Sequence, residues 1–286
     1  MADATKHLVQ REITVDADAD TVFGLIADVA GWSQVFASVL HAETGPDPLP
    51  GTSTGELCRI WALIDGERLA WTSRRTLDWE RRTVSFSRIE PLEPVAFAVG
   101  EWQVVAVDQR YSQVVLVQEF STPAQDDGAA TRWEQLVGRE TDAQLSALRT
   151  AAQTGPGRAE LQLTFSVSEF IDAPAAGVLA ALGRSDHPDS SVRIGFPERR
   201  TVVRKEYAVP PQVAAHTARW TVEEEGDGTR VVSWHTVTLD PVGVFGVHGS
   251  GATLADAREA VTRRLSTEST AQLVAVRAAL EAGGPQ

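Results

Sequence analysis

The 286-residue sequence contains two related copies of one segment, with their parts in the same order. The pattern S-x-R-x4-E-R-R-T-V begins at Ser73 and again at Ser191, and Trp102 and Trp220 have the same offset of 118 residues. The stretch 140–149 resembles 268–277 at an offset of 128, and 15–17 resembles 171–173 at an offset of 156. This period is far too long for a solenoid repeat, so the sequence predicts a duplicated domain.

The boundaries follow from the two copies. We expect an N-terminal domain over 1–153, a linker over 154–158 that contains Gly155-Pro-Gly157, and a C-terminal domain over 159–286. Because the offset falls from 156 to 118, 38 residues are absent from the second copy, between about Leu182 and Ser190. Either the second domain has lost several elements, or the sequence omits a stretch of the chain. We favour omission, because losing that much sheet would expose unpaired strand edges.

Apolar periodicity gives a coarse architecture for one copy. We expect a strand over 7–15, helices over 20–30 and 32–40, a loop over 46–51 and a long helix over 132–152. Between loop and long helix we expect strands over 57–64, 69–77, 83–89, 95–107 and 114–120. This order indicates an α+β fold, in which a curved antiparallel sheet holds a long C-terminal helix. A cavity between sheet and helix would be a natural site for a small molecule. In the second copy we interpret the glycine-rich stretch 246–251 as a loop.

Composition excludes several classes of function. The formal net charge is −13, which disfavours binding to nucleic acid or to an anionic membrane surface. The single cysteine, Cys58, excludes an internal disulfide and a cysteine-based zinc cluster. No apolar run reaches about 18 residues and residues 1–11 contain no apolar signal core, so we expect a soluble cytoplasmic protein.

The strand predicted over 69–77 carries the most informative polar residues. Side chains of a strand alternate between its two faces, so the odd-numbered residues share one face. These are Leu69, Trp71, Ser73, Arg75 and Leu77. A guanidinium in such an apolar row is costly to bury unless it meets an anion or several acceptors.

Two interpretations of Arg75 follow. Its five N–H donors could hold a carbonyl or enolate oxygen of a bound ligand. Alternatively, it could pair with a carboxylate such as Glu119 across the sheet. We favour the ligand, because the Ser-x-Arg pair returns as Ser191 and Arg193.

The sequence allows more than one role for the aromatic residues and the histidines. Trp61, Trp71 and Trp102 lie on predicted strands and either line an aromatic pocket or pack in the core. No histidine has metal-ligand spacing, so we expect no metal. His216 and His235 lie on consecutive predicted strands and could approach each other, although we favour the interpretation that they are ordinary polar strand residues. We find no phosphate-binding loop and no nucleophile elbow.

Several of these stretches resemble one known family. They are Trp32 with Phe36, the strand 71–75, the run from Arg82 to Glu90, and Val117-Gln118-Glu119-Phe120. In this combination and order they resemble the aromatase/cyclases of bacterial type II polyketide synthases. The duplication, with 215–217 and Trp220 in the second half, is similar to the di-domain subclass.

The resemblance implies a fold and an activity. The fold would be two tandem helix-grip domains, START-like or Bet v 1-like, the second one shortened. The activity would need no cofactor and would act on a poly-β-ketone chain tethered to an acyl carrier protein. The enzyme would direct first-ring aldol closure (C7–C12 type), dehydration to an aromatic ring, or both, in antibiotic biosynthesis. Other synthase subunits, such as the ketosynthase and the ketoreductase, are further expected partners.

The resemblance also implies roles for single residues. Arg75 matches the essential arginine of the single-domain relatives, and Ser73 and Trp71 match pocket residues. Where some relatives have a pocket tyrosine, this chain has Val39. Ser73, Arg75 or ordered water could protonate the leaving hydroxyl during dehydration. We therefore assign catalysis to Arg75, Ser73 and Arg193. We assign substrate binding to Trp32, Phe36, Trp61, Trp71, Phe86, Arg88, Trp102, Gln118, Ser191, His216 and Trp220.

Two alternatives stay open, because a fold does not fix a function. The chain could be a START-like carrier that holds a hydrophobic molecule without changing it. The second copy could also be a structural partner that supports the first, as its shortening would suggest.

Overall fold

The computed structural model describes residues 4–47, 55–90, 95, 97–123, 127–154, 157–184, 190–248 and 253–282. The chain forms two compact units that divide between residues 156 and 157. No helix among the described residues is long and apolar enough to cross a membrane.

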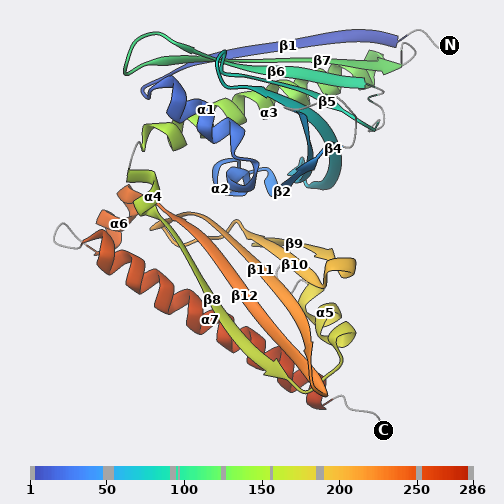
Figure 1. Ribbon diagram of the computed structural model, residues 1–286, viewed down its shortest axis with the longest axis vertical. Helices are drawn as coiled ribbons and strands as arrows, with labels where there is room; N and C mark the ends of the chain where they lie inside the picture. Colours follow the sequence, from blue (N-terminus) through green and yellow to red (C-terminus); the bar gives the residue numbers. More distant parts are fainter. Residues whose placement is uncertain are drawn as a thin grey trace. The chain divides into compact units, whose positions relative to one another are not determined.

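The N-terminal unit is a seven-stranded antiparallel sheet that curves around the long helix α3 (Asp127–Gln153) (Figure 1). The strand order is β1-β7-β6-β5-β4-β3-β2. The strands are β1 (Ala4–Val15), β2 (Val39–Pro46), β3 (Gly55–Ile64), β4 (Glu67–Asp78), β5 (Thr83–Arg88), β6 (Phe97–Ala106) and β7 (Ser112–Pro123). Helix α1 (Ala19–Ala27), the 3-10 turn η1 (Val29–Gly31) and α2 (Trp32–Val35) connect β1 to β2.

Local sequence explains where α1 begins and how it packs. Asp18 caps the helix, because its Oδ1 accepts a hydrogen bond from the Thr21 backbone N–H at 2.9 Å. Val22, Phe23 and Ile26 are fully buried, as their helical spacing predicts. They join Leu145 and Leu148 of α3 in the main core of the unit.

Turn chemistry also follows the sequence. Asp65 and Gly66, at φ values of 49° and 81°, form the tight turn between β3 and β4. The repeated E-R-R-T-V motif is a second turn. Arg82 and Arg200 both have left-handed backbone, and their carbonyls accept from Val104 N and Val222 N at 3.0 Å. The motif therefore repeats because both copies need the same strand connection.

The structure corrects four expected elements. The helix expected over 32–40 ends at Val35, and residues 39–46 form β2, a strand that we did not predict. The strand expected over 95–107 covers Phe97–Ala106, with Val95 in an isolated bridge. The long helix begins at Asp127, five residues earlier than expected. In the second copy, α6 (Pro241–His248) covers part of the glycine-rich stretch interpreted as a loop, and residues 249–251 lie outside the described ones.

The C-terminal unit repeats this plan with fewer strands. Its sheet has the order β8-β12-β11-β10-β9. The strands are β8 (Gln162–Ile171), β9 (Ser191–Phe196), β10 (Thr201–Glu206), β11 (Val213–Glu225) and β12 (Gly228–Leu239). The helices are α4 (Arg158–Leu161), α5 (Ala175–Gly183), α6 and the long α7 (Leu254–Ala282), and the 3-10 turn η3 (Pro197–Arg199) precedes β10.

The shortening of the second copy has a definite structural meaning. By sequence order, β8 and α5 correspond to β1 and α1, and β9 corresponds to β4. The described residues between α5 and β9 contain no counterpart of α2, β2 or β3. Consequently β9 is an edge strand here, whereas β4 is paired on both sides by β3 and β5.

Candidate functional site

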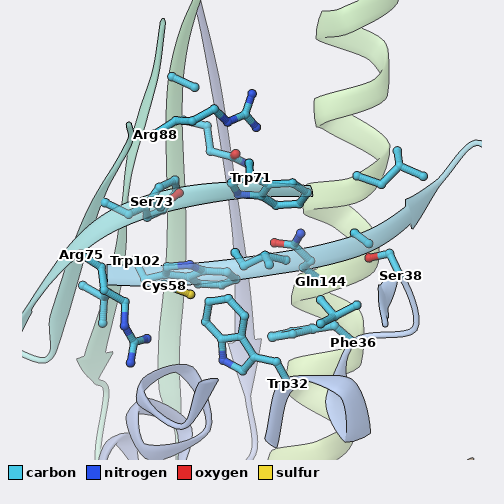
Figure 2. A pocket seen from close by; sticks show the side chains of 18 residues that line it. Trp32, Phe36, Ser38, Cys58, Trp71, Ser73, Arg75, Arg88, Trp102 and Gln144 are labelled. Atoms are coloured by element: carbon cyan, nitrogen blue, oxygen red, sulfur yellow. The ribbon is translucent and has the colours of Figure 1, made fainter. Parts of the chain in front are cut away.

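A cavity lies under the curved sheet of the N-terminal unit, facing α3 (Figure 2). The cavity has a volume of about 130 Å³, and most of its lining is apolar. The cavity is lined by the predicted residues Trp32, Phe36, Trp71, Ser73, Arg75, Phe86, Arg88, Trp102 and Gln118. It is also lined by residues that we did not single out, among them Ser38, Cys58, Ile60 and Gln144, and by Val39.

Arg75 points inward, as the alternation along β4 predicts, and is only 3 % exposed. Its Nη1 donates to the Ile26 carbonyl at 3.2 Å, its Nη2 donates to the Ala27 carbonyl at 2.5 Å, and its Nε forms an ion pair with Glu56. Arg75 thus has a carboxylate partner on the neighbouring strand, as the alternative interpretation allowed, but Glu119, the carboxylate named there, pairs with Lys6 instead. One N–H on each terminal nitrogen of Arg75 has no partner among the described residues.

The contacts of Arg75 explain why the arginine recurs. Ile26 and Ala27 are the last residues of α1, where carbonyls lack helical partners. Arg193 does the same in the second copy, where its Nη1 donates to the Leu182 carbonyl at 3.1 Å and to the Arg184 carbonyl. The repeated arginine therefore donates hydrogen bonds to carbonyls at a helix C-terminus in both units. Because this structural role explains the repetition, the repetition by itself is not evidence for catalysis.

Arg88 is a second cation in the N-terminal cavity. Its guanidinium lies 5.3 Å from the centre of the Trp71 ring, and no described carboxylate contacts it. Burial lowers its pKa, but a guanidinium stays charged near neutral pH. Arg75 and Arg88, which both line the cavity, are therefore the two cations that oxygens of a ligand could meet there.

The remaining polar groups have different roles. Ser73 is buried beside the cavity, whereas Gln118 Nε2 donates to Thr141 Oγ1 at 2.7 Å and ties β7 to α3. Burial raises the pKa of Cys58 to about 12, despite the opposing charge of Arg75. Cys58 is thus an uncharged thiol in the wall and not a nucleophile.

Trp61 was predicted to bind substrate, but it is not among the residues that line the cavity. Cys58, Ile60 and Ala62 of β3 face the core, so Trp61 faces the other side of the sheet. There its ring lies 5.3 Å from the ring of His41. Glu56 is the partner of Arg75 that we missed, and it lies directly opposite Arg75 in the β3–β4 register.

The C-terminal unit has a cavity of its own, with a volume of about 200 Å³. Of the residues predicted in this copy, His216 lines it. Trp220 is fully buried in the core, and the buried residues Ser191 and Arg193 are not among the lining residues. His216 Nε2 lies 2.9 Å from His235 Nδ1, which brings together the two histidines whose approach the strand order allowed.

We expect this histidine pair to make the stability of the C-terminal unit pH-dependent. Burial lowers the pKa of His216 to about 3 and that of His235 to about 4. Unfolded histidines titrate near 6.5, so the unfolded chain binds protons first as the pH falls. The stabilisation is complete above pH 6.5 and is lost towards pH 4, at up to ~1.4 kcal/mol per pH unit for each histidine.

Hydrogen exchange of the β11 and β12 amides between pH 7.5 and 5 measures this loss. The variant His216→Phe should lose about half of the pH dependence, because one titrating group remains. Equal pH dependence in the variant and the parent would contradict the assignment.

No three His, Cys, Asp or Glu side chains among the described residues are grouped closely enough to hold a metal ion.

Residues 6–153 match the family model for polyketide cyclase / dehydrase and lipid transport. The chain is 29% identical to the granaticin polyketide synthase bifunctional cyclase/dehydratase of Streptomyces violaceoruber, over 94% of this chain and 93% of that protein. It is 28% identical to the actinorhodin polyketide synthase bifunctional cyclase/dehydratase of Streptomyces coelicolor, over 98% of both.

Solved structures agree with this relationship. The crystal structure of the di-domain ARO/CYC BexL from the BE-7585A biosynthetic pathway is 31% identical, with a TM-score of 0.75, over 96% of this chain and 99% of that one. The di-domain ARO/CYC StfQ from the steffimycin biosynthetic pathway is 24% identical and supports the fold, with a TM-score of 0.73 over 96% and 98%. The chain therefore belongs to the polyketide cyclase/dehydrase and lipid transport family, and within it to the di-domain ARO/CYC proteins.

Proposed function

We propose that the chain is a polyketide cyclase/aromatase that folds a carrier-bound poly-β-ketone and closes its first ring. The observation that carries the proposal is Arg75, a buried guanidinium that lines an otherwise largely apolar cavity and keeps two N–H donors for a ligand. The names of the related synthase cyclase/dehydratases support the same reaction type.

The geometry suits the chemical problem. A poly-β-ketone is reactive, and the difficulty lies in choosing which carbons meet. A shaped cavity with aromatic walls restricts the conformations of the chain, and orientation alone can lower a barrier by several kcal/mol. Trp32, Trp71 and Trp102 supply these walls (Figure 2).

The cations suit the charge that develops during ring closure. Enolisation places negative charge on a ketone oxygen, and fixed donors in a water-poor site stabilise it strongly. We assign this role to Arg75. Arg88 would hold a second oxygen along the same chain, and Ser73 would donate to the hydroxyl that leaves during dehydration.

We further propose the finer details of the reaction. The substrate arrives on an acyl carrier protein in the cytoplasm, alongside the ketosynthase and ketoreductase of a type II synthase. Ring closure joins carbons 7 and 12.

A second candidate function is carriage of a hydrophobic molecule without reaction. It is favoured by the contacts of Arg75, which are explained in part by the end of α1 and by Glu56 without any ligand. The family description also includes lipid transport.

Reconstitution separates the two functions. The purified chain is added to a ketosynthase, a carrier protein and a malonyl supply, and the products are separated by mass and NMR. A cyclase converts a mixture of spontaneous products into one regiospecifically closed ring. The variant Trp61→Phe, which changes a residue outside the cavity, should behave like the parent. An unchanged product mixture in the presence of the chain would refute the cyclase.

A further inference from the structure

The repeated arginine has a different position in each unit. Arg75 and Arg193 both donate to carbonyls at the end of the preceding helix. Arg75 nevertheless lines a cavity, whereas Arg193 is not among the residues that line the cavity of the C-terminal unit. The helix-end carbonyls alone therefore do not keep a guanidinium at a cavity wall. The difference points to a partner that only the N-terminal unit has.

Each arginine lies against a different tryptophan, and a guanidinium is attracted to the face of an indole ring. The guanidinium carbon of Arg75 is 5.7 Å from the centre of the Trp32 ring, at the start of α2. That of Arg193 is 5.8 Å from the centre of the Trp220 ring, which is fully buried on β11. The described residues of the C-terminal unit contain no counterpart of α2, and hence no equivalent of Trp32.

Trp32 also shares a hydrogen-bond acceptor with Arg75. The indole Nε1 donates to the Ile26 carbonyl at 3.2 Å, and Arg75 Nη1 donates to the same carbonyl, also at 3.2 Å. Ile26 lies in the last turn of α1, where carbonyls lack helical partners. A carbonyl oxygen has two lone pairs and can accept both bonds. The indole and the guanidinium are thus attached to one point at the end of the helix.

Neighbouring residues fix the indole itself. The Trp32 carbonyl accepts a hydrogen bond from the Phe36 backbone N–H at 2.8 Å. The ring of Phe36, which is buried, meets the indole edge-on with ring centres 5.7 Å apart. Figure 2 shows the indole between the side chains of Arg75 and Phe36. A functional group is held precisely when the residues that support it are themselves locked by packing and hydrogen bonds.

We propose that Trp32 is a positioning residue for Arg75, in addition to forming part of the cavity wall. Its N–H and its ring hold the guanidinium at the wall, where it meets an oxygen of the ligand. The consequence for the reaction rests on the proposed function, but the positioning itself is a property of the free protein. The proposal also explains Arg193, which without α2 lies against the buried Trp220 and does not line the cavity.

The free protein tests the positioning directly by NMR with nitrogen-labelled arginine. A guanidinium that is held in place gives separate signals for its two terminal nitrogens, because rotation about the Nε–Cζ bond is slow. A guanidinium that rotates quickly gives one averaged signal. The variant Arg75→Lys identifies the signals of Arg75, because its spectrum lacks them. We expect separate signals in the parent and one averaged signal in Trp32→Phe, which loses the N–H and has a smaller ring.

Trp71→Phe is the matched control. Trp71 is another tryptophan of the cavity wall, and its ring lies 5.3 Å from the guanidinium of Arg88. This variant should leave the two signals of Arg75 separate. Hydrogen exchange of the β4 amides shows whether each variant is folded, so that loss of the fold is not mistaken for loss of positioning.

The reconstituted synthase tests the consequence for the reaction. We expect Trp32→Phe to lower the yield of the correctly closed ring about tenfold, because misplacing a group by about 1 Å can cost up to about 10²-fold in rate. The yield is measured as the fraction of product with the parent ring pattern.

The outcomes are distinct. A folded Trp32→Phe variant with separate Arg75 signals, or with the parent ring pattern, would overturn the proposal. One averaged signal in the parent or in Trp71→Phe would overturn it as well, because the restraint would then not come from Trp32. If the signals behave as expected but the parent chain directs no ring closure, the proposed cyclase fails and the positioning of Arg75 by Trp32 stands.

Discussion

Replacing Arg75 with alanine is expected to lower the yield of the correctly closed ring at least a hundredfold in the reconstituted synthase. Removing one preorganised donor to a developing oxyanion typically costs about 10²–10³ in rate. Arg75 is a buried cation that lines the N-terminal cavity from β4, and its two remaining N–H groups would be lost together. The yield is measured as the fraction of product with the parent ring pattern.

The same substitution also removes structural contacts, so stability must be measured beside yield. Glu56 and the carbonyls of Ile26 and Ala27 would lose their partner. Breaking a buried ion pair can cost about 3–5 kcal/mol, although Glu56 is partly exposed, which reduces the figure. Glu56→Gln is the matched variant, since it weakens the ion pair and leaves the guanidinium in place. We expect it to retain the ring pattern.

Arg193→Ala provides the comparison between the copies. It removes the equivalent helix-end contacts, to the carbonyls of Leu182 and Arg184, in the C-terminal unit. Loss of the ring pattern in both arginine variants would support the catalytic role that we predicted for Arg193. If only Arg75→Ala loses the ring pattern, the role of Arg193 is structural and not catalytic. A folded Arg75→Ala variant with the parent product profile would refute the cyclase mechanism.

Adding one methyl group at Gly100 is expected to destabilise the N-terminal unit and to reduce its cavity. A Cβ at this position would collide with the ring of Phe86 and would lie 2.5 Å from the Val117 carbonyl oxygen. Phe86 is directly opposite Gly100 in the β5–β6 register and lines the cavity, so its ring must move when the methyl group is added. Overpacking of this kind costs roughly 1–3 kcal/mol.

Urea unfolding of the N-terminal unit measures this cost, and reconstitution measures the change in product. Gly45→Ala is the control, because a Cβ at Gly45 on β2 meets no atom within 4 Å. We expect Gly45→Ala to keep the parent stability and ring pattern. If Gly100→Ala is as stable as Gly45→Ala and yields the same product, Phe86 does not shape the cavity as we describe.

Part of the site could be predicted because it depends on local rules. The inward direction of Ser73 and Arg75 follows from the alternation of side chains along one strand. The same rule, applied to β3, would have shown that Trp61 faces away from Cys58 and Ile60. The alternation along 57–64 was therefore a usable signal, and the expectation for Trp61 weighed only its residue type.

The partners of the polar residues depended on longer-range relations. Glu56 is 19 residues from Arg75 in sequence and meets it because the Asp65-Gly66 turn fixes the β3–β4 register. The strand β2 was missed because a single short helical turn precedes it, and apolar residues in such a short stretch fit helix and strand equally well.

The sequence by itself determined that the chain is a duplicated α+β protein and which face of β4 carries the arginine, because order along the chain and alternation along a strand are local properties. Only the tertiary structure decided that this arginine closes the end of α1 and pairs with Glu56. It also decided that His216 and His235 share a hydrogen bond beside a second cavity. Such pairings depend on the strand register and on how the long helix packs over the sheet. Both are determined by the total free energy of many contacts between residues that are distant in sequence.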